Sequence, residues 1–123
     1  MKLENDGGIL ESLDRAKEVA RAALDIKAED VVILDVRDLT SFTSYFVIAS
    51  GRSDRQVKSI ADSIWEKLKT NGQNPLAIEG YESGSWVLVD FGDVIAHSFF
   101  SETREFYNLE KLWSDAPRIK VDE

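Results

Sequence analysis

The sequence predicts an α/β fold in which a mixed β-sheet of about five strands is flanked by helices. Two apolar segments, 30–36 (DVVILDV) and 44–50 (SYFVIAS), have strand length and are rich in β-branched residues. Because apolar residues run through them almost continuously, we expect both strands to be buried on two faces, as central strands covered by helices are. A chain of 123 residues is long enough for one such domain and too short for two ordinary ones.

The first helix is predicted over residues 9–27. Apolar side chains recur there at steps of three and four residues, and charged side chains fall between them. The recurring positions are Ile9, Leu10, Leu13, Ala16, Ala20, Ala23 and Leu24. This spacing places one apolar stripe along the helix, which is typical of a helix packed against a sheet.

A second helix is predicted to begin after Ser53, because Ser53 and Gln56 have the spacing of a capping box. In that motif the serine hydroxyl accepts from the backbone N–H of residue 56, and the glutamine amide reaches back to the N–H of residue 53. The helix is expected to end at Asn71-Gly72, since Pro75 lies just beyond. A short strand, 76–80 (LAIEG), follows.

Residues 86–91 and 94–100 are predicted to form a β-hairpin around Gly92-Asp93, because glycine at the first position of a two-residue loop suits a type II′ turn. The turn fixes the pairing, with Trp86 opposite Phe99. The more uniformly apolar side is expected to face the core, and it carries Val87, Val89, Phe91, Val94, Ala96, Ser98 and Phe100. The other side has a mixed composition suited to recognition, and it carries Trp86, Leu88, Asp90, Ile95, His97 and Phe99.

After the hairpin, the segment ETREFYNLEKLWSDAP predicts a C-terminal helix docked on the domain. Its apolar residues at helical spacing are Phe106, Leu109, Leu112 and Trp113. Arg104 and Tyr107 are its polar candidates for contacts. The domain is expected to span residues 9–117, with flexible ends at 1–8 and 118–123.

The charge distribution restricts the possible partners. The formal net charge is −8, and residues 79–123 hold ten acidic and four basic side chains. This balance argues against a dominant phosphate-neutralising surface, so no direct sequence-specific nucleic-acid binding is expected. The acidic C-terminal part either attracts a basic protein surface or only keeps the chain soluble, and charge alone does not decide between the two.

The chain has no cysteine, which excludes disulfides and cysteine-ligated zinc. No apolar run approaches membrane-spanning length, and the first residues, MKLENDGG, lack the pattern of a signal peptide. We therefore expect a cytoplasmic protein without membrane contact.

Several motifs with catalytic associations are better explained otherwise. Asp90-Phe91-Gly92 resembles a kinase triplet, but the glycine-rich loop and the catalytic loop of kinases are missing. His97, the only histidine, could act as a general base oriented by Asp90, yet no serine or threonine lies in a nucleophile-elbow context, so a packed or interface role is favoured. A single histidine with scattered carboxylates predicts no metal site and no cofactor. The run SGRSD could cradle a phosphate, but the capping box already explains its serine.

Two longer runs, SYFVIASGRSDRQVKSIAD and EGYESGSWVLVDFGDVIAHSFFSETREFYNLEKLWSDAP, occur in this order and close together. In them the chain resembles the ribosomal silencing factor family, also called the RsfS or Iojap family, over roughly residues 9–117. The signature positions present are Trp86, Asp90, Gly92, Asp93, His97, Arg104, Tyr107, Leu109, Glu110, Leu112 and Trp113. The family usually has tyrosine where Phe91 stands.

The resemblance implies a ribosomal silencing factor that binds the large ribosomal subunit at its intersubunit face. The implied partner is a basic large-subunit protein, the one numbered fourteen, and the implied effect is a steric block to subunit joining that represses translation under nutrient limitation. Free members are implied to form homodimers. We expect the partner-binding residues to be Trp86, Asp90, Asp93, His97, Phe99, Arg104 and Tyr107.

The implied fold is related to nucleotidyltransferases, which leaves an enzyme as the alternative: a residual nucleotide-binding or nucleotidyltransferase-like domain. Such an enzyme needs paired aspartates to hold magnesium on the strand after the GRSD segment. That strand reads LAIEG and has no such pair. The sequence therefore favours a binding role without catalysis.

Overall fold

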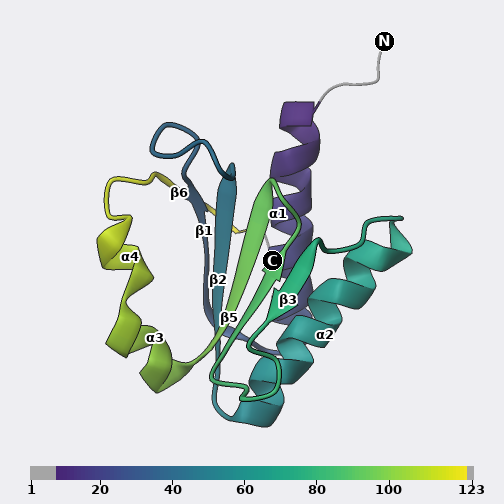
Figure 1. The fold of residues 1–123 in the computed structure, drawn as a ribbon, viewed down its shortest axis with the longest axis vertical. Coiled ribbons are helices and arrows are strands. Elements are labelled where there is room, and N and C mark those ends of the chain that lie inside the picture. Colours follow the sequence, from purple (N-terminus) through teal and green to yellow (C-terminus); the bar gives the residue numbers. More distant parts are fainter. Residues whose placement is uncertain (1–7, 122–123) are drawn as a thin grey trace.

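The computed structural model describes residues 8–121 and the side chains of residues 12–121 (Figure 1). The strands in this range are β1 (Glu29–Asp35), β2 (Tyr45–Gly51), β3 (Ala77–Glu79), β4 (Trp86–Asp90), β5 (Val94–Phe100) and β6 (Arg118–Ile119). The helices are α1 (Gly8–Asp25), α2 (Asp54–Thr70), α3 (Ser101–Tyr107) and α4 (Leu109–Leu112). The six strands of this described part form one sheet in the order β3-β4-β5-β2-β1-β6.

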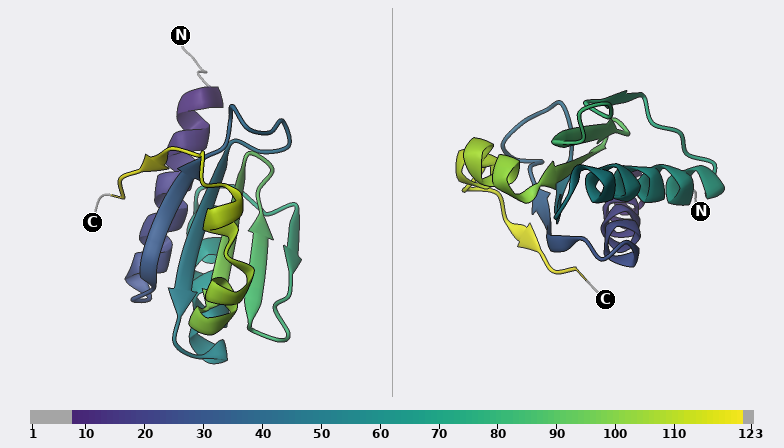
Figure 2. Two further views of the ribbon diagram at one scale, coloured as in Figure 1. Left: turned by 90° about the vertical axis from the view of Figure 1, so that its left-hand side faces the viewer. Right: turned by 90° about the horizontal axis from the view of Figure 1, so that it is seen from below.

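The sheet is sandwiched between two layers of helices. α1 and α2 cover one face, and α3 and α4 lie on the other (Figure 2). β2 and β5 run parallel at the centre, and the other neighbouring strands in the described sheet are antiparallel. The parallel pair needs a crossover connection, which contains α2, β3 and β4. The predicted mixed α/β fold is confirmed.

Regular structure in the described residues extends beyond the predicted domain bounds of 9–117. Arg118 and Ile119, expected in a flexible tail, pair with Leu34 and Ile33 as β6. Ile119 packs against the core beneath α1 and α2, which explains why this segment is held. A strand of two residues carries too little periodicity to be detected in a sequence. Gly8 likewise begins α1, whereas residues 1–7 and 122–123 lie outside the described part.

Two hydrophobic cores lie on opposite faces of the sheet. The first core, under α1 and α2, is formed by residues that include Val19, Val47, Ile60, Ile64, Val87 and Val89. The second core, under α3 and α4, is formed by Leu34, Val36, Phe46, Ile48, Ile95, Phe99 and Ala116. β2 supplies both cores and is buried along its whole length, as predicted, whereas β1 lies nearer the sheet edge and is only partly buried.

The hairpin has the predicted register. Trp86 lies opposite Phe99 and Leu88 lies opposite His97, and Gly92 adopts a φ of 94°, a value that favours glycine. The side predicted to face the core does face the first core. The side predicted for recognition is mostly the floor of the second core, because α3 and α4 cover it.

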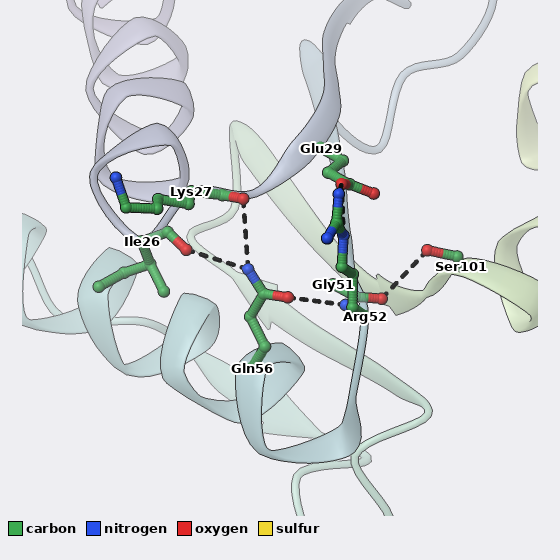
Figure 3. A network of polar contacts seen from close by, with 7 residues as sticks. All are labelled: Ile26, Lys27, Glu29, Gly51, Arg52, Gln56 and Ser101. Carbon is green, nitrogen blue, oxygen red and sulfur yellow. Dashed lines mark hydrogen bonds and ion pairs between the residues drawn. The ribbon is translucent and has the colours of Figure 1, made fainter.

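At the start of α2, the predicted hydrogen bond to the Ser53 side chain is present. The predicted hydrogen bond to the Gln56 side chain comes from a different residue. The Ser53 hydroxyl accepts from the backbone N–H of Gln56 at 3.1 Å. Gln56 in turn accepts from the N–H of Arg52 at 2.7 Å, not from that of residue 53 (Figure 3). The same amide donates to the carbonyls of Ile26 and Lys27 at 3.1 and 3.2 Å, and these two acceptors orient it. No helix of the described chain is long and apolar enough to cross a membrane.

Candidate partner-binding site

Four side chains on the α3 side of the sheet form an accessible surface, which we call the aromatic surface: Trp86, Leu88, Phe106 and Tyr107. Trp86 and Leu88 come from β4 and are half-buried, whereas Phe106 and Tyr107 end α3 and are exposed. The Tyr107 ring lies 5.0 Å from the Trp86 ring, and Phe106 lies 5.0 Å from Tyr107, centroid to centroid. Exposed aromatic side chains in contact with one another are typical of binding surfaces.

Acidic residues border the aromatic surface. Glu79 on β3 is exposed and lines a shallow pocket of about 240 Å³ with Gly80, Trp86 and Leu88. Asp90, at the end of β4, is half-buried and accepts from the backbone N–H of Gly92 at 2.7 Å. On α3, which carries Phe106 and Tyr107, Glu102 is exposed, whereas Glu105 lines a separate cavity with Arg104 and Arg118. The surface therefore combines apolar contact area with negative charge.

His97 lies beneath Trp86 and is buried, with 5% of its surface exposed. The indole Nε1–H of Trp86 donates to His97 Nδ1 at 3.1 Å, so the neutral imidazole carries its proton on Nε2. Burial lowers the pKa of His97 to about 4. In this structure His97, predicted to add a hydrogen bond at the partner's edge, lies below the surface and orients Trp86.

Phe99 and Arg104 are also interior residues. Phe99 is fully buried and stacks beneath Trp86 at 4.8 Å between ring centroids. Arg104 is buried, forms two 2.9 Å hydrogen bonds to the Glu110 carboxylate and donates to the Ser50 hydroxyl at 2.8 Å. The pKa of Glu110 is lowered, mainly by its hydrogen bonds from Arg104. Neither Phe99 nor Arg104 is available for the direct contact expected from the sequence.

Asp93 already has a cationic partner within the chain. At the hairpin tip its carboxylate pairs with Arg15 of α1 and accepts from the Ser12 hydroxyl. The prediction that Asp93 faces a lysine or arginine of another protein is not supported by this arrangement. Of the predicted site residues, the structure brings Trp86 and Tyr107 together on the surface, with Asp90 on the same strand as Trp86.

The sequence missed two exposed residues, Phe106 and Leu112, which were expected to dock. They are 81% and 75% exposed, whereas Leu109 and Trp113 pack against the second core. The reason is Asn108, whose left-handed conformation (φ 49°) ends α3 and starts α4, so that the apolar stripe is interrupted. Asparagine tolerates this conformation better than most residues, which makes Asn108 the signal that could have revealed the break.

The groups that suggested catalysis are engaged elsewhere. Asp90 binds the hairpin turn, His97 binds Trp86, and Ser53 caps α2. A polar cavity of about 680 Å³ beside α3 is lined by Arg104, Glu110 and Arg118 among others, and both arginines already pair with Glu110. Among the described residues, no group of three histidine or acidic side chains is arranged to hold a metal ion.

The fold and the surface define a class of protein: an α/β domain whose aromatic side chains gather on one face, as in proteins that act by binding other macromolecules. The chain belongs to the RsfS family, described as ribosomal silencing factor during starvation, whose profile matches residues 10–123. The family resemblance predicted from the sequence is therefore confirmed.

Individual relatives agree with this assignment. The chain is 44% identical over 106 residues to the ribosomal silencing factor RsfS of Bacillus subtilis, an alignment that covers 85% of this chain and 90% of the relative. A more distant relative is the mitochondrial assembly of ribosomal large subunit protein 1 of Mus musculus, 37% identical over 90 residues, 71% of this chain and 40% of that protein. A crystal structure of a Chromobacterium violaceum protein has a TM-score of 0.82 at 39% identity and covers 90% of this chain and 92% of that one. The named relatives are silencing and assembly factors, which fits a protein that is not an enzyme.

Proposed function

We propose that this chain is a cytoplasmic ribosomal silencing factor that binds the large ribosomal subunit through a basic protein at the intersubunit face. Bound there, it blocks joining of the small subunit and represses translation under nutrient limitation, without catalysis. The observation that carries the proposal is the aromatic surface, bordered by acidic residues, on a member of the RsfS family. The names of the relatives, which refer to ribosomal silencing and to the ribosomal large subunit, support the choice of partner.

The physical basis is complementarity with a basic protein. Trp86, Phe106 and Tyr107 offer aromatic side chains, and a few residues, often aromatic ones, carry most of the binding energy in protein interfaces. Glu79 and Asp90 lie beside them, and the surrounding segment 79–123 has six more acidic than basic side chains. Such a field attracts a cationic surface and raises the rate of association at low salt.

Co-sedimentation of the purified chain with isolated large subunits, small subunits and joined ribosomes tests the proposal. We expect binding to large subunits alone, weaker at high salt. Phe106→Ala should weaken binding about tenfold, because an aromatic hot spot contributes more than about 1 kcal/mol. Since Phe106 is exposed, this variant keeps its fold, and Trp86→Ala provides a second test whose folding is checked by thermal melting.

Lys67→Ala, on the exposed side of α2, is the matched control and should bind as the wild type does. Equal binding to both subunits, or full affinity in a folded Phe106→Ala, Trp86→Ala double variant, would contradict the proposed surface.

The free protein is proposed to form a homodimer through the same aromatic surface. An exposed apolar patch on a soluble protein is commonly covered by a second copy when its partner is absent. Dimerisation and ribosome binding would then compete for Trp86 and its neighbours.

A further inference from the structure

β3 is the end strand of the sheet, and one of its edges is open. Within residues 8–121, β3 pairs with β4 only. On β4, the N–H of Phe91 donates to Val94 of β5, so by alternation the backbone groups of Asp90 and Leu88 point to β3, where their partners are Ala77 and Glu79. The N–H and C=O of Ile78, which lies between these two partners, therefore point to the open edge. Unpaired backbone groups along a strand edge are a template for a further strand.

An apolar notch opens beside this edge, between β3 and α2. It has a volume of about 260 Å³ and is lined by Ala61, Asp62, Trp65, Ile78 and Tyr81. Trp65 and Tyr81 are 40% and 39% exposed, although both form its walls. The volume suits one large apolar side chain, and it is smaller than the clefts that bind most small molecules.

The position of Tyr81, one wall of the notch, is fixed by side-chain contacts and by the turn before it. Its hydroxyl donates to Asp62 at 3.0 Å, and the Lys58 ammonium lies 5.7 Å from its ring centroid. Gly80, just before it, has a φ of 79°, and a Cβ there would lie 2.1 Å from the carbonyl oxygen of Trp86. Only glycine permits this turn, so the backbone fixes Tyr81 over α2 before any ligand arrives.

A strand added to β3 would use the notch directly. Its residue opposite Ile78 would point to the α2 side, about 5 Å from Ile78, and so into the space between Trp65 and Tyr81. The residues on either side would point to the opposite face, where Glu79 is exposed next to Trp86 and Leu88. One strand would therefore contact both the notch and the border of the aromatic surface.

We propose that the open edge of β3 takes up an extended segment of the basic large-subunit protein, with an apolar side chain in the notch and a basic side chain beside Glu79. The identity of this partner rests on the proposed function. A second copy of the chain fits less well, because Glu79, Glu82 and Asp62 would approach their own equivalents. The edge also continues the aromatic surface, since Glu79 and Gly80 share a pocket with Trp86.

Two variants test the notch and the charge. Trp65→Ala removes one wall, and Glu79→Lys reverses the charge at the edge. We expect each to weaken co-sedimentation with isolated large subunits about tenfold. Glu79→Lys should melt close to the wild type because Glu79 is exposed, and thermal melting checks the fold of Trp65→Ala, because Trp65 is only 40% exposed. Lys67→Ala, two residues along α2 from Trp65, is again the matched control.

Hydrogen exchange separates strand addition from a loose contact. Binding of large subunits should slow exchange of the Ile78 amide at least tenfold in the wild type and less in Trp65→Ala. If Phe106→Ala loses binding while Trp65→Ala and Glu79→Lys bind normally and Ile78 stays unprotected, the inference is wrong and the proposed function stands. If the wild type binds no large subunits, both fail. Protection of Ile78 in the concentrated free protein, lost on dilution, would assign the edge to a second copy and also overturn the inference.

Discussion

The indole of Trp86 is oriented by neighbours that no partner can reach. Its N–H donates to buried His97, and its ring stacks on buried Phe99. Ordering a free side chain on binding costs about 0.5–1.5 kcal/mol. Because the indole is held before binding, much of this cost is already met in the free protein. His97 and Phe99 therefore contribute to recognition through Trp86.

We expect mild acid to destabilise the fold through His97, because burial lowers the pKa of its imidazole from 6.5 to about 4. As the pH falls, the unfolded chain binds a proton near pH 6.5, whereas the folded chain binds it only near pH 4. The free energy of unfolding therefore decreases across this window, by about 2 kcal/mol between pH 7 and pH 5. Urea unfolding followed by tryptophan fluorescence at both pH values measures the loss.

His97→Asn is the matched control for this effect. Its amide oxygen can accept from Trp86 in place of Nδ1, and the amide does not titrate. Ordinary carboxylates change little above pH 5, so the variant should be nearly as stable at pH 5 as at pH 7. A loss as large as that of the wild type would show that another group is responsible.

At the residue scale, the sequence predicted which strand face carries each hairpin side chain, because a two-residue turn fixes the register. It could not predict which of these side chains stay accessible. That depends on α3, α4 and the segment around Phe42, which contacts Phe46 and Trp113 from above the second core. The alternation of apolar and polar residues along a strand shows which side chains share a face. It carries no information about which segments cover that face.

At the scale of elements, one side chain of α2, Gln56, bonds to the turn that follows α1. Gln56 accepts from Arg52 and donates to the carbonyls of Ile26 and Lys27. Gln56→Glu keeps the acceptor and loses the donor, and it places a carboxylate against two carbonyl oxygens. We expect the variant to lose about 1–2 kcal/mol of unfolding free energy, measured by urea unfolding at pH 7.

The sign of this effect is diagnostic. A negative charge in the first turn of a helix ordinarily stabilises it by about 0.3–1 kcal/mol. If Gln56 only capped α2, Gln56→Glu would therefore be neutral or stabilising. Ser59→Ala, one turn further along α2, serves as a control and should change stability little.

The C-terminal segment illustrates the limit of periodicity at this scale. The spacing of Phe106, Leu109, Leu112 and Trp113 predicts one docked helix, but the structure has two short helices with a left-handed Asn108 between them. One unusual backbone conformation rotates the apolar positions that follow it, so part of the stripe points to solvent. A pattern that assumes a regular helix cannot anticipate this rotation.

At the scale of the whole molecule, we expect a substitution in the aromatic surface to weaken self-association and ribosome binding together. If one surface serves both, Phe106→Ala should weaken each about tenfold. Sedimentation equilibrium of the free protein and co-sedimentation with large subunits give the two affinities. Loss of one affinity without the other would separate the surfaces, and so would a dimer crosslinked through the aromatic surface that still binds large subunits.

The global architecture was largely accessible from the sequence. Continuous apolar runs identified β1 and β2, and the capping residues located α2, because these signals are local. The strand order, the pairing of β6 and the second core depend on contacts between distant segments. These contacts decide which predicted site residues are exposed, so the site was harder to predict than the fold.

The second core has a consequence for how the protein is made. Its floor comes from β1, β2 and β5, but its cover, α3 and α4, is synthesised after all three strands. While the chain is still emerging, Phe46, Ile95 and Phe99 face water, and Trp86 lacks its contact with Tyr107. A product that stops after residue 100 would expose the apolar side chains of this sheet face to water and would lack the part of the aromatic surface that α3 supplies. Incomplete copies would thus be candidates for chaperones and proteases rather than competitors for the ribosome.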